Sequence, residues 1–310
     1  MAGDKPAARP ARTRKRVQAD APGPESRIVV GLDTNLMARD ALALAARLAA
    51  SVDARLKGVF VEDENLLSLC SLPFAREISL SGEVRAVDAE KMLRAMRAQA
   101  ETARRVLQHV ASEAHVDWSF DVLRGRSLAS LAAAARAEDT LVIRAPEASL
   151  REIGRVVRAA TSETRADVLL FARGVGAKGL LVATGPLPAR GASARPIAAA
   201  DDGSSLGEAC AAFAETLAKR AGVPFRRLRL RGHGAAEIAD AARHAGAGLI
   251  VVNAGWLRDD DDAARLSAVA GCPLLLLGGE RTPRRTPVPA RRKSPPPADI
   301  PPPAKTENGV

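Results

Sequence analysis

Two stretches of the chain, Arg27-Ile-Val-Val-Gly-Leu-Asp33-Thr-Asn and Arg195-Pro-Ile-Ala-Ala-Ala-Asp-Asp202-Gly-Ser, share one pattern and decide the fold. Each is a short apolar run that ends in an aspartate. Each is followed by an alanine-rich helical run and then by a second apolar strand, over 54–61 or 224–230. Short continuous apolar runs are typical of buried parallel strands, and strands that alternate with helices indicate an α/β fold. The repeat therefore predicts two similar α/β units in one chain.

Composition sets the boundaries of these units. The predicted segments are a disordered basic N-terminal segment over 1–26, a first unit over 27–172, a linker over 173–194, a shorter second unit over 195–279 and a Pro-rich basic disordered tail over 280–310. The first unit also holds a long amphipathic run over 84–112, which we interpret as a helix, and an irregular insertion over 62–84. Neither of these has a counterpart in the second unit.

The positive charge of the chain lies mainly in its two ends. The net charge is +10, of which 1–26 carries +3 and 281–310 carries +5, so that +2 remains for 27–280. Aromatic residues make up 3% of the chain and Tyr is absent, so the stacking platforms that bind single strands are missing. We expect no specific nucleic-acid recognition, only a salt-sensitive attraction of the two ends to polyanions.

Several classes of site lack their sequence signals. The three cysteines have no paired spacing, the four histidines form no HExxH motif, and neither a Walker A loop nor a Gly-x-Ser-x-Gly elbow occurs. We therefore expect no metal site, no catalytic residues and no enzyme. No apolar run is long enough to span a bilayer and no signal-peptide core precedes the first unit, which favours a cytoplasmic protein.

The order and spacing of several short motifs resemble the universal stress protein family. These motifs are the two opening stretches, Leu123-Arg-Gly125, Asp139-Thr-Leu-Val-Ile143 and Gly271-Cys-Pro-Leu-Leu-Leu-Leu277. The chain looks like a tandem, divergent member of that family, over 27–172 and 195–278. The resemblance implies two Rossmann-like, adenine nucleotide alpha hydrolase-like three-layer units with parallel sheets. Family members usually dimerise, partly through their last strand, which implies that 167–172 pairs with 272–277 as an intramolecular pseudo-dimer; a homodimer is also compatible.

The resemblance also suggests residues for an adenine nucleotide. In the family, the aspartate after the first strand contacts adenine and a residue at the end of the second strand lines the base pocket. Asp33 and Val61 match these two roles in the first unit, and Asp202 matches the first role, as a vestige, in the second.

The family's glycine-rich phosphate loop is not matched. After the fourth strand of the first unit only Gly154 corresponds to the loop, and Arg155 replaces the Ser/Thr that follows. Arg144 and Arg155 could bind phosphate directly, or they are solvated charges on a helix.

In the second unit, the four carboxylates of Asp259–Asp262 stand where phosphates would bind, and they suit a helix N-terminus instead. We interpret His233 as an ordinary loop histidine. Trp256 is expected either to anchor its own loop or to pack between the halves.

These observations favour a non-catalytic, regulatory stress-response protein that acts by contact with unknown protein partners and needs no cofactor. One alternative is a sensor or weak ATPase whose first unit binds ATP or AMP. Another, implied by the family, is an accessory regulatory subunit of a membrane transporter or kinase.

Overall fold

The computed structural model of the chain describes residues 26–32, 38–70, 72–78, 81–125, 127–144, 150–171, 195–259 and 261–278. Outside these residues lie Asp33, the predicted linker and the predicted C-terminal tail. The predicted N-terminal segment also lies outside them, apart from Ser26. Among the helices that the structure describes, none combines the length and the apolarity that a bilayer crossing requires.

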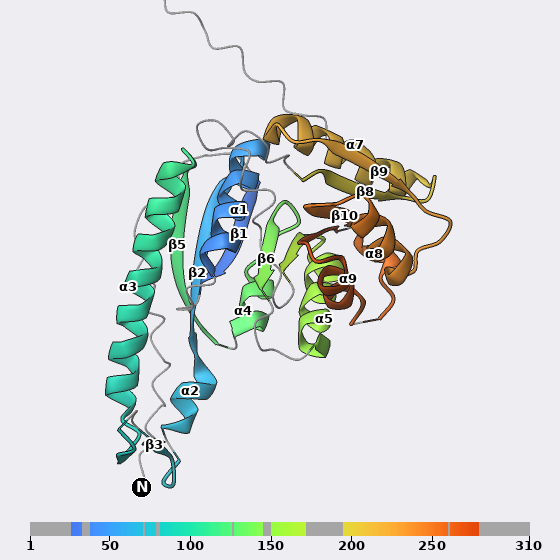
Figure 1. Ribbon diagram of the computed structural model, residues 1–310. Helices are drawn as coiled ribbons and strands as arrows, with labels where there is room; N and C mark the ends of the chain where they lie inside the picture. The colour runs from blue at the N-terminus through green and yellow to red at the C-terminus, as the bar shows by residue number, and fades with distance from the viewer. Residues whose placement is uncertain are drawn as a thin grey trace, which may run out of the picture.

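Strands and helices alternate through most of both halves (Figure 1). The first half contains β1 (Arg27–Leu32), α1 (Ala38–Val52), β2 (Arg55–Asp63), α2 (Glu64–Leu69), β3 (Arg76–Ile78), β4 (Val84–Ala86), α3 (Ala89–Glu113), β5 (Trp118–Gly125), α4 (Ser127–Ala133), β6 (Thr140–Arg144), α5 (Leu150–Arg158), the π-helical turn η1 (Ala159–Glu163) and β7 (Asp167–Phe171). The second half contains β8 (Ile197–Asp201), α7 (Ser205–Ala221), β9 (Phe225–Arg229), α8 (Ala235–His244), β10 (Leu249–Asn253), the 3₁₀ turn η3 (Ala254–Trp256), α9 (Asp262–Ala270) and β11 (Leu274–Leu277).

One nine-stranded sheet passes through both halves, in the order β5-β2-β1-β6-β7-β11-β10-β8-β9. Neighbouring strands are parallel within each half, as the apolar runs predict. The α/β fold class is therefore confirmed. The second half has no strand equivalent to β5 within 195–278, in agreement with its shorter sequence.

The two halves meet where β7 pairs with β11, and this is the antiparallel step of the sheet. Leu169 lies opposite Leu275, and Leu170 and Val168 lie opposite Leu274 and Leu276. The prediction that these two segments pair is confirmed. Because the strands run in opposite directions here, the carboxyl edges of the two halves lie at opposite edges of the sheet.

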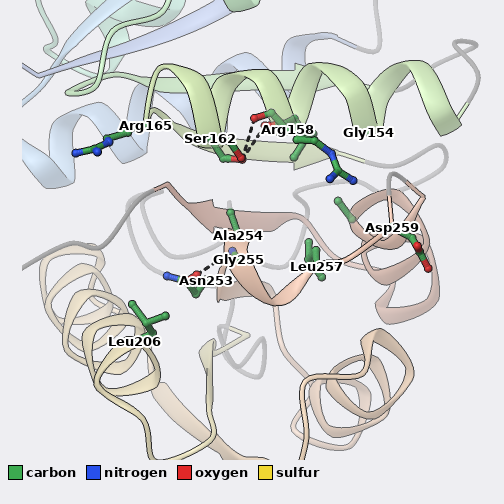
Figure 2. A pocket seen from close by; sticks show the side chains of 13 residues that line it. Gly154, Arg158, Ser162, Arg165, Leu206, Asn253, Ala254, Gly255, Leu257 and Asp259 are labelled. Atoms are coloured by element: carbon green, nitrogen blue, oxygen red, sulfur yellow. Dashed lines mark hydrogen bonds between the residues drawn. The ribbon is translucent and has the colours of Figure 1, made fainter.

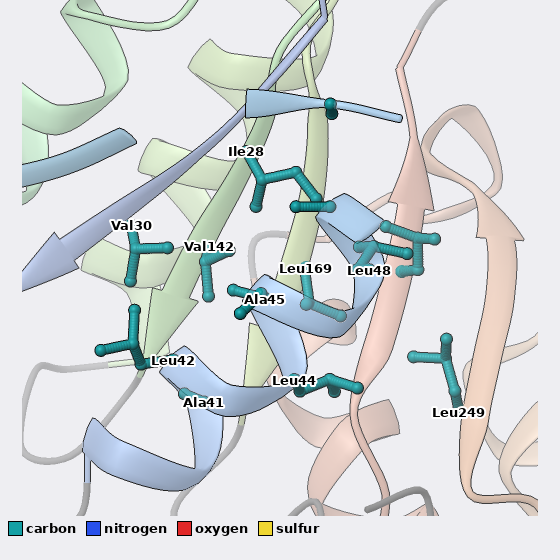
Figure 3. Close-up of a cluster of buried hydrophobic side chains, with 14 of the residues drawn as sticks. Ile28, Val30, Ala41, Leu42, Leu44, Ala45, Leu48, Val142, Leu169 and Leu249 are labelled. Carbon is teal, nitrogen blue, oxygen red and sulfur yellow. The ribbon is translucent and has the colours of Figure 1, made fainter. Parts of the chain in front are cut away.

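Helices cover both faces of the sheet, and each face has a core that runs across the junction. On one face, α1, α3 and α7 bury side chains from both halves, such as Val30 and Leu249 (Figure 3). On the other face, α4, α5, α8 and α9 bury a second set that includes Leu141 and Ile250. The alanine-rich helices suit this arrangement because small side chains let a helix approach the sheet closely.

The prediction that 62–84 is irregular is wrong. β2 continues to Asp63, whose side chain accepts a hydrogen bond from the Asn65 N–H at 2.8 Å and caps α2. β3 and β4 then form a hairpin. The helix expected from residue 84 begins only at Ala89, because the Asp88 side chain caps the N–H groups of Glu90 and Lys91. Local capping by aspartates thus creates elements that hydrophobic periodicity alone does not reveal.

Candidate functional site

The carboxyl edge of the second half gathers residues from three separate loops. β8 lies between β9 and β10, so the segments that follow these three strands meet at one place. They bring Asp202, His233 and Trp256 together, although these residues are 23 to 54 positions apart in sequence. The end of a parallel strand beside a change in strand order is where ligands of open α/β sheets usually bind.

The carboxylate of Asp202 makes its hydrogen bonds within the chain. Its Oδ1 accepts the N–H of Ser204 at 3.0 Å and the hydroxyl of Ser204 at 2.5 Å. Its Oδ2 lies 2.5 Å from Nε2 of His233. Burial raises the pKa of Asp202, but the hydrogen bonds from Ser204 and His233 outweigh that effect and lower the pKa to about 2. The carboxylate of Asp202, which the resemblance places beside adenine, is thus ionised and already hydrogen-bonded to Ser204 and His233.

His233 also stacks on Trp256. The two ring centroids are 4.8 Å apart and the rings are inclined by 13°. Trp256 is buried and belongs to a core that both halves share, and its stack on His233 links its own loop to the loop after β9. His233 is therefore more than an ordinary loop histidine: it joins the loop after β9 to the loops after β8 and β10.

At the place where phosphates would bind, backbone N–H groups already donate hydrogen bonds to side chains of this chain. The Gly255 N–H donates to Asn253 Oδ1 at 2.8 Å. The N–H groups of Arg258 and Asp259 both donate to Asp262 Oδ2, at 3.1 and 3.0 Å. Asp262 lies in the first turn of α9, as expected, but its carboxylate binds the preceding loop. A phosphate needs such free N–H donors, and at these three positions they already have partners.

A second carboxylate at this edge, that of Asp201, also makes its hydrogen bonds within the chain. It is buried, and its Oδ2 accepts from Arg227 Nε at 2.7 Å while its Oδ1 accepts the Gly203 N–H at 3.0 Å. A Cβ at Gly207, in the first turn of α7, would lie 2.6 Å from an oxygen of both Asp201 and Asp202. A glycine at position 207 therefore lets α7 begin against the two carboxylates.

A cavity of about 500 Å³ lies beside this edge, between the two halves (Figure 2). Figure 2 shows α5 and η1 on one side and the 253–259 loop on the other. The charged groups around it have both signs: Arg158 and Arg165 come from the first half, and Asp259 comes from the second. Arg158 is held there by a hydrogen bond from its guanidinium to the Arg258 carbonyl at 3.1 Å. The volume of the cavity is within the range of ligand pockets, but charged groups of both signs around it do not match a triphosphate.

The first-half candidates are only partly brought together. Asp33 lies outside the described residues. Val61 lies near the end of β2, and Arg144 is the last residue of β6. Since β2 and β6 lie on either side of β1, these two residues flank the end of β1. Glu62 follows Val61 and is paired with Arg124 of β5 at 2.9 Å.

The other two candidates lie on α5. Gly154 is buried and lines the cavity between the halves, where it faces the second-half loop. Arg155 is exposed. Among the described residues that line this cavity, neither Val61 nor Arg144 occurs.

The cysteines and the acidic groups provide no further site in the described part of the chain. No cluster of three His, Cys, Asp or Glu side chains that could hold a metal is found there. Burial raises the pKa values of the Cys210 and Cys272 thiols to about 12, so both are unreactive core residues.

Comparison with known proteins identifies the fold. The chain matches no protein-family model and no curated protein. It superposes on a universal stress protein from Archaeoglobus fulgidus DSM 4304 with a TM-score of 0.50 and 10% identity, over 82% of this chain and 97% of that one. This likeness confirms the predicted fold, and at such low identity it shows the fold alone.

Two further solved structures align less closely. The cytoplasmic domain of a prokaryotic cation chloride cotransporter gives a TM-score of 0.46 at 14% identity, over 83% of this chain and 98% of that one. A universal stress protein family member from Burkholderia pseudomallei gives 0.20 at 18% identity, over 82% and 96%. Neither superposition is close enough to support an argument.

Proposed function

We propose that this chain, which has the fold of universal stress proteins, is a tandem regulatory protein of that type that acts by protein contact without catalysis. We further propose that its second half does not bind nucleotide. The observation that carries the proposal is that the polar groups which would contact a nucleotide at the second-half edge are already hydrogen-bonded within the chain. Asp202 is bonded to Ser204 and His233, and Asp262 takes the loop N–H groups that a phosphate would need.

The same cluster supports a role without catalysis. A hydroxyl becomes a nucleophile when a base accepts its proton, and histidine is the commonest such base. In this cluster the Ser204 hydroxyl donates to the Asp202 carboxylate, which hydrogen bonds hold at a pKa of about 2. So weak a base does not activate a serine at neutral pH. His233 in turn faces Asp202 and Trp256.

Tryptophan fluorescence tests the second-half proposal directly. The chain has two tryptophans and no tyrosine, so the variant Trp118→Phe leaves Trp256 as the one tryptophan reporter. Because Trp256 stacks on His233, a ligand at this edge would change its emission. We expect ATP and AMP, with Mg²⁺, to leave the emission unchanged at millimolar concentration. A saturable change that disappears in Asp202→Ala would overturn the proposal.

A second candidate function is an adenine-nucleotide sensor that uses the first half. It is favoured by Val61 and Arg144, which flank the end of β1 where Asp33 follows in sequence. A ligand that binds the folded state raises the melting temperature. A rise with ATP or AMP that is lost in Asp33→Ala, with Trp256 emission unchanged, would support this candidate.

A further inference from the structure

The segment 64–95, which we call the arm, is the part of the described structure where exposed apolar side chains gather. It comprises α2, the β3–β4 hairpin and the first two turns of α3, and it lies at one end of the molecule, away from the nine-stranded sheet (Figure 1). Eight large hydrophobic side chains are exposed among the described residues, and six of them belong to the arm: Leu66, Leu69, Leu72, Phe74, Ile78 and Val84.

The hairpin of the arm has no core of its own. All six residues of β3 and β4 are exposed, and Phe74, just before β3, is 75% exposed. Ile78 lies directly opposite Val84, whereas Glu77 lies opposite Arg85. Since alternate residues of a strand point to opposite faces, one face carries Ile78, Val84 and Ala86 with a single charged residue, Arg76, and the other carries Glu77 and Arg85. The first face is therefore the more apolar one. An isolated two-stranded hairpin is marginal in water, so its apolar face requires a cover.

The helices of the arm lack burial in the same way. α2 contains no buried residue. The buried residues of α3 begin only at Met96, so its first two turns extend beyond the core. The six exposed side chains together present apolar surface on the order of several hundred Å², which is at the upper limit for a monomer and close to what one partner contributes to a specific interface.

Charge and composition indicate the partner. The arm carries five acidic and four basic residues, a net charge of −1, so it does not attract an anionic membrane or a nucleic acid. The two ends of the chain offer few apolar side chains for such a contact, because 1–25 and 279–310 contain only five scattered large aliphatic residues: Met1, Val17, Val288, Ile300 and Val310. A second arm offers a matching apolar face, balanced charges and strand edges that are open for pairing.

We propose that the arm is a self-association surface, through which two copies of this chain form a symmetric dimer. The contact buries Phe74, Ile78 and Val84 against the same residues of the second copy. This dimer is separate from the β7·β11 junction, which already joins the two halves within one chain.

Molar mass in solution tests the proposal on the full chain. Light scattering after gel filtration is measured at loading concentrations from about 1 to about 100 µM, the range of moderate protein affinities. We expect twice the chain mass of 32.4 kDa at high concentration. The double variant Phe74→Asp/Ile78→Asp should give the chain mass at every concentration. Because both side chains are about three-quarters exposed, its melting temperature should not fall.

The matched control is Val269→Asp on α9, which removes an apolar side chain that is 51% exposed and lies outside the arm. This control should dimerise as the parent does. A parent that stays monomeric throughout would overturn the proposal and leave 172–194 as a candidate cover for the arm. A dimer that persists in the double variant would also overturn it.

Cysteine labelling gives an independent readout. Cys70 ends α2 in the arm and is partly exposed, whereas Cys210 and Cys272 are buried. We expect the rate at which a neutral maleimide modifies Cys70 to fall several-fold as the parent is concentrated. The rate should stay constant in Phe74→Asp/Ile78→Asp. A rate that is independent of concentration in a parent shown to be dimeric would place the interface elsewhere and overturn the proposal.

Discussion

Four strands of the first half, β2, β1, β6 and β7, correspond in order to β9, β8, β10 and β11 of the second, yet the amino edges of the two halves hold different polar contacts. Strand registers align Arg27 and Asp139 of the first half with Pro196 and Gly248 of the second. In the first half, Arg27 donates to the fully buried Asp139 at 2.9 and 2.5 Å. In the second half, the Gly248 N–H donates to the Pro196 carbonyl at 2.8 Å. Apolar strand positions therefore maintain the architecture, while the polar groups at the edge can be exchanged.

The carboxyl edges differ in the same manner. The registers place Arg144 of the first half at the position of Asn253 in the second, and Asn253 turns its side chain back to the Gly255 N–H. The second-half edge is closed by contacts among its own residues. The following four variants test how much these contacts contribute to the stability of each edge and of the junction between the halves.

The largest effect is expected from Asp139→Asn. The change removes the buried carboxylate that pairs with Arg27, which should lower the free energy of unfolding by about 4 kcal/mol. Urea denaturation measures the loss. As a control, Glu215→Gln removes an exposed ion pair with Lys219 and should leave stability unchanged. Equal losses in both variants would mean that the first-half edge does not depend on its ion pair.

Trp256→Ala tests the second-half closure. Removing a buried aromatic side chain and its stacking on His233 should cost about 3 kcal/mol of unfolding free energy. Trp256→Phe keeps a ring for stacking and should lose less than half as much in the same urea titration. If the two variants were equally stable, the stack would contribute nothing to this edge.

Gly278→Ala tests the junction where the two halves of the sheet meet. A Cβ at this position would lie 2.3 Å from the Ala166 carbonyl oxygen, and the Gly278 N–H donates to Asp167 at 2.9 Å. Because both contacts involve the backbone or a buried carboxylate, we expect a loss of about 2 kcal/mol in thermal or urea unfolding. Gly232→Ala serves as the control, since its Cβ would meet only the flexible end of Glu237. An unchanged Gly278→Ala protein would show that the junction can shift.

The smallest effect is expected from Asp202→Asn, and it should depend on pH. The pKa of Asp202 is lowered from an ordinary 3.8 to about 2, so the folded state holds this carboxylate ionised where the unfolded chain would protonate it. Its contribution is fully present above about pH 4 and is lost as the pH falls through about 2. We expect the variant to be less stable than the parent by about 1 kcal/mol at pH 7, a typical value for lost hydrogen bonds.

Unfolding measured from pH 7 down to pH 2.5 should show the two proteins converging in stability. A difference that stayed constant over this range would assign the effect to packing and not to the charge of Asp202.

Much of the fold could be predicted because buried parallel strands leave a local signal. The apolar run at 28–32 and the runs at 249–253 and 274–277 were visible without tertiary information. The sequence does not reveal the elements of 62–84, because α2 depends on its cap by Asp63, the β3–β4 hairpin is exposed throughout, and no apolar periodicity marks either. Short elements without buried residues have no hydrophobic pattern to detect.

The candidate site was predicted less completely. Asp202 was identified and the carboxylates before α9 were expected at a helix N-terminus, but the link between Asp202 and His233 was not foreseen. A useful signal was present, since both residues follow consecutive strands of the same unit. That signal does not predict the contact by itself, because the order of strands in a sheet depends on contacts between distant segments.

The sequence by itself thus determined the kinds of element, the shared pattern of the two opening stretches and the near-neutral charge of 27–280, since these follow from local composition and period. Tertiary structure alone decided which loops meet. β8 lies between β9 and β10, and this placement brings His233 to Asp202 and Trp256. It also decided that the apolar residues of the arm stay exposed, because burial depends on what the rest of the chain can reach. Contacts between distant segments arise from packing, and packing is a property of the whole fold.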